Sequence, residues 1–319
     1  MGSLQEGKAI AAAITTGIGI DENRLVSLGK WTSKDMPLFR SETQFFSKDD
    51  TYNFEKWKDG LFKHLKREFL RFENALVQWS MHPWERDARL ANEALSQQRQ
   101  SYDVLVEVAC ARSSEELLGA RKAYHSIFNL SLEEDVAFRT SGGQRKLLVA
   151  LVSSYRYEGQ KTNSAIAKEE AAKLRTAIEN GDKIKSKAIE DEELVRILST
   201  RSKLHLKATF DHYKETHKKN FDEDIGTDPI LKATVQCLST PPTYFSNVLD
   251  EALKDNADEK AKQALTRVIV TRAETDMKGI KEEYQKKTNA SLSDKIGEKT
   301  RGNYKEFLLN LVAIGDESK

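Results

Sequence analysis

The sequence predicts an all-α protein made of repeated helical units, and three observations lead to this. The 319 residues contain only five prolines and 16 glycines, which leaves room for long runs of helix formers. Apolar residues recur at helical spacing, as at Val104, Leu105 and Val108, and no alternation of period two is long enough to predict a sheet. The chain also repeats itself, which is typical of helical arrays.

The repeat is clearest between residues 112–152 and 272–312, which align without a gap at an offset of 160. Identical pairs include Arg112/Arg272, Tyr124/Tyr284, Asn129/Asn289, Gly142/Gly302 and Leu148/Leu308. Arg201 and Tyr213 stand at the same arginine-to-tyrosine spacing as in these two copies, so a third copy starts there. A divergent fourth copy fits the start of the chain, because residues 62–79 resemble the ends of the others.

These alignments give the predicted domain organisation. Repeats are expected at residues 4–76, 80–155, 171–240 and 241–315, with a linker at 156–170. The linker is predicted because "YEGQKTNSAIAKEE" is polar and has no apolar periodicity.

The composition limits the partners and the cellular compartment that can be expected for this protein. The 51 Lys+Arg nearly cancel the 50 Asp+Glu, so no global positive field favours nucleic acid. The longest apolar run, Leu147–Val152, is far shorter than the ~20 residues that span a bilayer. The first residues have no basic region followed by a long apolar one, so no secretory signal is expected and a cytoplasmic protein is predicted.

Two sequence features are similar to a known family. The four helical units, each of roughly 70 residues, together with "HPWERDARLANEAL" at 82–95, resemble the annexins, and "MHPWERDARL" and "GARKAYHS" resemble their plant branch. The resemblance implies four annexin repeats in a slightly curved disc, whose convex face binds Ca²⁺ and, through it, acidic phospholipid headgroups. It implies a peripheral membrane protein that is recruited when Ca²⁺ rises.

The same resemblance assigns a calcium loop to "TTGIGIDENRLVSL", residues 15–28. Carbonyls of Thr15, Gly17 and Gly19 would bind the ion, Glu68 would supply the closing carboxylate, and Ile18 at the loop tip would contact the membrane. Glycines allow a tight loop to turn carbonyls onto a hard cation. The interval from Gly19 to Glu68 is longer than is usual for the family. The alternative is a plain helix N-terminus capped by Asp21.

The other repeats depart from the calcium pattern. The second and fourth have Arg139 and Lys299 where an acid would close the site, and the third offers Asp224 but no glycine loop. One principal site is therefore expected, with a lipid-free Kd of roughly 10⁻⁴–10⁻³ M by comparison with sites of few carboxylates.

Further residues match positions to which the family gives other roles. The resemblance places Asp87, Glu107, Arg112 and Arg267 along a polar central channel, although mutual ion pairing is the favoured interpretation. Cys110 and Cys237 match two cysteines with a suspected redox role, but their apolar surroundings favour buried inert thiols.

The remaining predictions concern partners. Residues 195–197, "VRI", resemble a stretch proposed for actin contact, and self-association on a membrane could restore avidity. "DMKG" at 276–279 fits a short nucleotide pattern that is expected by chance, and we discount it. No catalytic constellation is found, so no enzyme is expected. The alternative function is a helical-repeat scaffold that has largely lost calcium binding.

Overall fold

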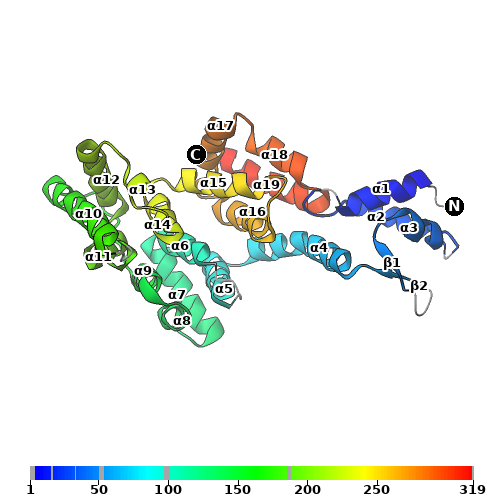
Figure 1. Ribbon diagram of the computed structural model, residues 1–319, viewed down its shortest axis with the longest axis horizontal. Coiled ribbons are helices and arrows are strands. Elements are labelled where there is room, and N and C mark those ends of the chain that lie inside the picture. The colour runs from blue at the N-terminus through cyan, green and yellow to red at the C-terminus, as the bar shows by residue number, and fades with distance from the viewer. Residues whose placement is uncertain are drawn as a thin grey trace. The chain divides into compact units, whose positions relative to one another are not determined.

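A computed structural model of the chain describes residues 4–15, 17–32, 34–49, 54–96, 101–184 and 188–317 (Figure 1). The chain forms two compact units, one of residues 1–80 with 245–319 and one of residues 81–244. Helices dominate both, and the predicted all-α fold is confirmed. No helix in the described ranges combines the length and the apolar character that crossing a bilayer requires.

The unit of residues 81–244 consists of two successive sets of helices. The first set is α5 Pro83–Ser96, α6 Tyr102–Cys110, α7 Ser114–Phe128, α8 Leu132–Arg139 and α9 Gly142–Ser153. The second is α10 Ser164–Ile184, the short η2 Ala188–Glu190, α11 Glu192–Thr200, α12 Lys203–His217, α13 Phe221–Asp224 and α14 Pro229–Ser239. α15 Pro241–Ala252 runs across the boundary between the units.

The repeat seen in the sequence recurs in the backbone. The third helix of three successive sets ends on a non-glycine residue in the left-handed region: Asn129 (φ 55°), Lys218 (φ 59°) and Asn289 (φ 56°). Each stands at the same interval in sequence after its anchoring arginine. A left-handed residue at a helix C-terminus lets the chain reverse onto the next helix, so the three sets share one turn.

The unit of residues 1–80 and 245–319 joins elements from both parts of the chain. Its C-terminal part contains α16 Glu259–Arg272, α17 Met277–Thr288, α18 Leu292–Lys299 and α19 Gly302–Glu317. Its N-terminal part contains α1 Leu4–Thr15, α2 Glu22–Val26, η1 Ser27–Lys30, α3 Met36–Glu42, β1 Phe46–Asp49, β2 Phe54–Trp57 and α4 Asp59–Ser80. α4 packs against α16 and α19.

α4 differs from the corresponding part of the other sets because it is uninterrupted (Figure 1). In the other sets the last two helices are separate, and a glycine with positive φ stands in the break or begins the last helix: Gly142 (61°), Gly226 (76°) and Gly302 (60°). Residues 61–80 contain neither glycine nor proline and are rich in helix formers. Nothing in this sequence therefore stops the helix, and two helices become one.

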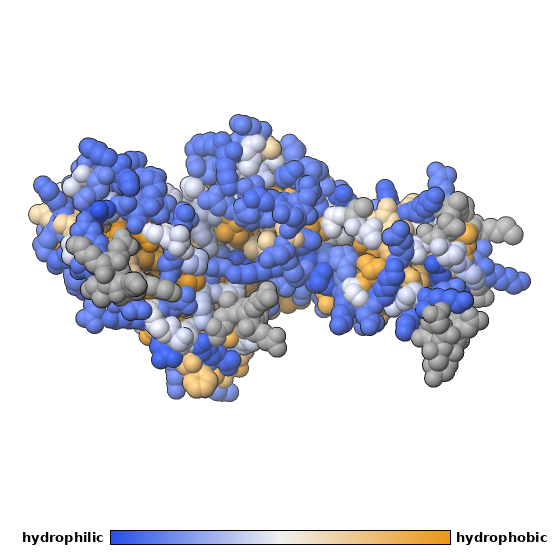
Figure 2. Space-filling view, viewed as in Figure 1, coloured by the Kyte–Doolittle hydropathy of each residue, from blue (hydrophilic) through white to orange (hydrophobic). Residues whose placement is uncertain are grey.

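The short hairpin of β1 and β2 was not predicted. The two strands pair antiparallel, with Phe46 opposite Trp57, and these rings lie 4.7 Å apart between centroids. Each strand has only four residues, too few for an alternating pattern to be recognised. The hairpin closes a small aromatic core in which Trp31, Phe39 and Phe45 are buried with residues of α1. Figure 2 shows patches of hydrophobic surface over these N-terminal elements, within a largely hydrophilic exterior.

Part of the predicted linker is helical. Residues 164–170 already belong to α10, which begins at Ser164. The side chain of Asn163 accepts the backbone N–H of Ile166 at 3.1 Å, which caps this helix, and Ala, Lys and Glu continue it. The expected boundaries of the repeats themselves remain a prediction.

Candidate metal centre

The loop between α1 and α2 has the backbone conformation that its glycines allow. Gly17 and Gly19 have φ of 84° and 85°, in the left-handed region. A Cβ on Gly17 would lie 2.9 Å from the carbonyl oxygen of Lys299, and one on Gly19 would lie 3.1 Å from that of Arg301. Because residues 17 and 19 have no side chains, the loop can pack closely against residues 299–301.

Ile18 forms the centre of that approach. Its N–H donates to the carbonyl of Lys299 at 2.8 Å, and its own carbonyl accepts the N–H of Arg301 at 2.9 Å, in a parallel bridge to Thr300. The Ile18 side chain is only 4% exposed. The expectation of an exposed loop tip is therefore wrong for this structure: a segment from the C-terminal part of the chain covers Ile18.

Thr15 and Asp21 flank the loop. Thr15 ends α1, is exposed, and donates its hydroxyl to the carbonyl of Ala11 at 3.1 Å. Asp21 accepts the N–H of Arg24 at 3.3 Å and so caps α2, as the alternative interpretation of this stretch expected. The cap and the glycine loop coexist, so the first does not rule out the second.

Glu68 reaches the loop in spite of the long interval. Its Oε2 accepts the N–H of Gly19 at 2.9 Å, across 49 residues of sequence. The long α4 makes this possible by carrying Glu68 beside the loop. The Glu68 side chain is 1% exposed, so its carboxylate is enclosed at this position.

The same carboxylate is bound by Arg71, a residue that the sequence analysis did not single out. Arg71 donates from Nε to Oε2 at 2.5 Å and from Nη2 to Oε1 at 2.7 Å. It also donates from Nη2 to both oxygens of Glu259 in α16 at 3.0 Å. Arg67 adds a contact of 2.8 Å to Glu259. The sequence did contain a sign of this pair. Glu68 and Arg71 are three residues apart, and this spacing places two side chains next to each other on one helix.

The electrostatics of the pair follow from burial and mutual contact. Burial by itself raises the pKa of Glu68, but hydrogen bonds from Arg71 and from the Gly19 N–H lower it overall. Burial likewise opposes the charged form of Arg71, yet Glu68 and Glu259 raise its pKa. Both groups therefore stay ionised, and the guanidinium supplies the positive charge next to Glu68.

The donors at this loop suit a hard cation. Among the described residues, no hydrogen bond is made to the carbonyls of Gly17 or Gly19, and Glu68 supplies an ionised carboxylate beside them. Oxygen ligands of this kind fit Ca²⁺. The described residues bring together no cluster of three or more His, Cys, Asp or Glu, so a site here depends on backbone carbonyls. Arg71 is the group with which a cation has to compete.

In the second and fourth sets basic side chains stand where a closing acid was expected. Arg139 pairs with Asp135 at 2.6 Å, and Lys299 pairs with Asp255 at 2.5 Å. Asp224, the acid expected to close the third site, accepts Arg175 at 2.8 Å and the Tyr213 hydroxyl at 2.8 Å. A protein cation pairs with an acid of this region in every set, the first included, and the first set differs because its acid, Glu68, also contacts a glycine loop.

The expected channel residues are paired where the structure describes them together. Arg112 donates to both oxygens of Asp87 at 2.6 and 2.8 Å, and both side chains are buried. Glu107 accepts the Tyr244 hydroxyl at 3.2 Å. Arg267 is partly buried and belongs to the other unit. The Asp87–Arg112 pair fits the interpretation that these charges satisfy each other.

The two cysteines are enclosed thiols. Cys110 and Cys237 are both 0% exposed and form no disulfide. Burial raises the pKa of Cys110 to about 11, although Arg156 and Lys203 act in the opposite direction. A protonated, inaccessible thiol is a poor nucleophile, so this environment favours the inert interpretation over the redox one.

The stretch that resembles an actin contact is mostly buried, and contact with actin remains a prediction. It lies in α11, where Val195 and Ile197 are buried and Arg196 is bound to Glu193 and Glu170. The three residues therefore mainly serve packing and local ion pairing.

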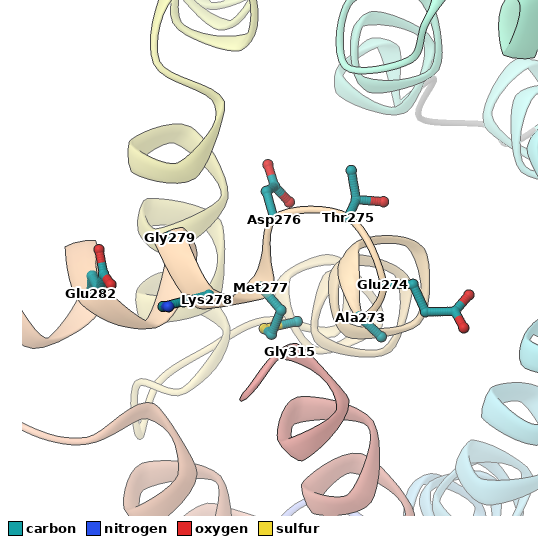
Figure 3. Close-up of a pocket in the computed structure, with 9 residues that line it drawn as sticks. All are labelled: Ala273, Glu274, Thr275, Asp276, Met277, Lys278, Gly279, Glu282 and Gly315. Carbon is teal, nitrogen blue, oxygen red and sulfur yellow. The ribbon is translucent and has the colours of Figure 1, made fainter. Parts of the chain in front are cut away.

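The residues of "DMKG" line a pocket of about 420 Å³ between α16 and α17 (Figure 3). Glu274, Asp276 and Glu282 outnumber Lys278 in its lining, and Asp276 is bound by Arg272 at 2.7 Å. Met277 points toward Gly315, which also lines the pocket (Figure 3). An excess of carboxylates disfavours phosphate groups, which agrees with discounting the nucleotide pattern.

Comparison with known proteins shows which family and which solved structures this chain is similar to. The annexin family model matches residues 86–151, 170–228 and 244–311. Annexin D4 of Arabidopsis thaliana is 46% identical over 313 residues, 97% of each chain. Among solved structures, annexin III (28% identity, TM-score 0.68, 98% of this chain and 94% of that one) and chicken annexin V in complex with Zn²⁺ (27%, 0.68, 99% and 96%) are similar. The matched segments do not include the first predicted repeat, the part in which α4 is uninterrupted.

Proposed function

Because this chain belongs to the annexin family, we propose that it is a peripheral, non-enzymatic protein that binds acidic phospholipid in a calcium-dependent manner. Family and fold support calcium-dependent phospholipid binding as the general function. The proposed setting is the cytoplasmic face of a membrane.

The principal calcium site is proposed at the loop between α1 and α2. The carbonyls of Thr15, Gly17 and Gly19 and the carboxylate of Glu68 would hold the ion. The observation that carries this proposal is the 2.9 Å contact between the Gly19 N–H and Glu68, since it brings the carboxylate of the proposed ligand set to the glycine loop. Bound Ca²⁺ would supply a bridge to a lipid phosphate.

Glu68 has to exchange partners for this to occur. Its oxygens are bound by Arg71 in the structure, so releasing them costs two charge-assisted hydrogen bonds. Arg71 retains Glu259 as a partner after that release. This exchange, together with a single principal loop in place of several, supports a weak site that needs raised Ca²⁺.

The proposal is tested by co-sedimentation with phosphatidylserine vesicles across a Ca²⁺ titration. Wild-type protein should bind only at raised Ca²⁺, and Glu68→Gln should lose that binding because the amide keeps the shape and removes the charge. Glu215→Gln is the matched control, since this exposed residue of α12 has the same charge and lies outside the loop. Binding that is indifferent to Ca²⁺, or equal in Glu68→Gln and wild type, would sink the assignment.

A second candidate is the scaffold function in which calcium binding has largely been lost. The observation in its favour is that Arg71 is bound to Glu68, and that Arg139 and Lys299, which stand where closing acids were expected, form ion pairs of their own. Under this function the same titration would give no calcium-dependent binding by the wild-type protein at any Ca²⁺ concentration.

A further inference from the structure

Arg301 brings a guanidinium group to the glycine loop from a distant part of the chain. The residue directly precedes α19, and its backbone N–H donates to the Ile18 carbonyl at 2.9 Å. Its side chain lies against the loop as well, because a Cβ on Gly17 would stand 3.1 Å from Cγ and 3.2 Å from Cζ of Arg301. The positive charge is therefore next to one of the residues proposed to bind Ca²⁺.

The hydrogen bonds of Arg301 fix one nitrogen of its guanidinium and leave the other two open. Nη1 donates to the carbonyl of Glu298 at 2.6 Å and to that of Thr300 at 2.8 Å. Within the described ranges, Nε and Nη2 have no hydrogen-bond acceptor, and the group forms no ion pair with a carboxylate. The side chain is partly exposed. An oriented guanidinium edge is thus open to a ligand from solution.

Other basic side chains near the loop already have acidic partners. Arg71 is bound to Glu68, and Lys299 is bound to Asp255 at 2.5 Å. Arg301 differs from both, since no acid of the described residues pairs with it. A cation that is not neutralised internally is the one best suited to an external anion.

The second set shows that the turn before α19 does not need an arginine. At the offset of 160 residues, Arg301 corresponds to Ser141. The residues on either side behave alike in the two sets. The Thr140 and Thr300 hydroxyls each donate at 2.6 Å to a carbonyl four residues earlier, and Gly142 and Gly302 have φ of 61° and 60°. The formation of the turn therefore does not explain the guanidinium.

The chemistry of the open edge suits a phosphodiester. Such a group has two non-ester oxygens that share one negative charge, so one can accept from a guanidinium while the other remains available to a cation. The planar fork of arginine matches phosphate oxygens in geometry as well as in charge. Without an anion, the same positive charge repels Ca²⁺ from the neighbouring loop. Arg301 should therefore oppose the binding of Ca²⁺ alone and favour the binding of Ca²⁺ together with phosphate.

We propose that Arg301 is a phosphate-binding residue of the candidate metal centre, where it donates to the phosphodiester of a lipid headgroup that also contacts Ca²⁺ at the glycine loop. This inference rests on the calcium-dependent lipid binding proposed above. It adds a residue that couples the two ligands, because each ligand offsets the unfavourable charge that the other meets at the site.

The test compares Arg301→Gln and Arg301→Lys with wild type in two titrations with Ca²⁺. The first follows co-sedimentation with phosphatidylserine vesicles, and the second follows the thermal midpoint without lipid. For Arg301→Gln, half-maximal vesicle binding should need roughly five- to tenfold more Ca²⁺. Its lipid-free response should be unchanged or should occur at lower Ca²⁺. Arg301→Lys keeps the charge but loses the fork, so its vesicle binding should be intermediate.

A matched control and a soluble ligand complete the design. Lys286→Gln removes a positive charge from an exposed side chain of α17 in the same unit and should behave like wild type. Dimethyl phosphate supplies the phosphodiester without a membrane. If it lowers the Ca²⁺ needed for the thermal shift of wild type but not of Arg301→Gln, any phosphodiester is a ligand. If only vesicles separate the two proteins, the ligand is the headgroup at a lipid surface. The thermal midpoint in EDTA checks that each variant is folded.

Three results would overturn the proposal. If Arg301→Gln keeps both the lipid-free response and the vesicle binding of wild type, Arg301 has no role in binding phosphate, although the calcium site stands. If both titrations of Arg301→Gln shift to higher Ca²⁺ by the same factor, the side chain supports the loop and does not bind a headgroup. If wild type itself responds to Ca²⁺ in neither titration, the calcium site fails and the role of Arg301 fails with it.

Discussion

Glu68 and Arg71 lie one turn apart on α4 and form a buried ion pair in which both carboxylate oxygens accept guanidinium hydrogen bonds, at 2.5 and 2.7 Å. Glu68 is also the acid that reaches the glycine loop. The residue that would complete a calcium site is thus held by an internal cation, and this relationship leads to the first two predictions.

Arg71→Gln should make the protein more sensitive to Ca²⁺. The change removes the competing cation, so the Ca²⁺ concentration for half-maximal vesicle binding should fall roughly three- to tenfold. The thermal midpoint in EDTA should fall as well, because Glu68 keeps only the Gly19 N–H as a described hydrogen-bond partner, and Ca²⁺ should restore it. Lys63→Gln, a change at an exposed basic residue of α4, is the control. An unchanged Ca²⁺ requirement in Arg71→Gln would contradict competition at this site.

The Glu68–Arg71 pair should give a defined acid dependence of stability. The pKa of Glu68 in the folded protein lies below its ordinary value of 4.5, so the unfolded chain binds the proton first as pH falls. The stabilisation is complete above pH 4.5 and is lost as pH falls through the folded pKa. Urea unfolding of wild type and Glu68→Gln between pH 3 and 7 measures it. The difference between them should be constant at neutral pH and shrink in acid; a difference that grows with acid would exclude this assignment.

Gly17→Ala should destabilise the unit of residues 1–80 and 245–319. A methyl group there meets the Lys299 carbonyl at 2.9 Å, and φ of 84° is unfavourable for alanine. The free energy of unfolding should fall by roughly 1–3 kcal/mol. Gly60→Ala is the matched control, since its Cβ meets nothing within 4 Å and it lies in the first turn of α4. Equal stability of the two variants would show that the loop does not need glycine at 17.

Cys110 should be unreactive in the folded protein. Its thiol is 0% exposed and its pKa is raised to about 11, so at pH 8 little thiolate is present. A chromogenic disulfide reagent should label Cys110 slowly in buffer and rapidly in denaturing urea, with Cys237→Ser used to follow this thiol alone. Rapid labelling under native conditions would revive the redox interpretation.

Features that repeat along the chain could be predicted from the sequence, and features made by distant contacts could not. The constant step from arginine to tyrosine identified the helical sets, and the buried Tyr124, Tyr213 and Tyr284 agree with it. The burial of Ile18 had no local signal, because it depends on a bridge to Thr300. A contact between residues so far apart in the sequence leaves no local pattern from which it could be predicted.

Two departures had a signal that is visible in retrospect. Residues 61–80 lack the glycine that breaks the corresponding helices of the other sets, and this absence predicts one long α4. The spacing of Glu68 and Arg71 predicts that they can pair, but the burial that makes the pair strong comes from α16 and α19. The family resemblance predicted that Glu68 is a metal ligand, but it assigned no role to Arg71.

The bridge between Ile18 and Thr300 also bears on the order in which the protein folds. Residues 81–244 are contiguous and can form their unit as soon as they leave the ribosome. The glycine loop has to wait for residues 299–301, because its hydrogen bonds are made to them. Such distant pairing is slow since a long loop must close first. During synthesis the N-terminal helices therefore remain without their final partner, and the segment that contains the candidate metal centre is among the last to be completed.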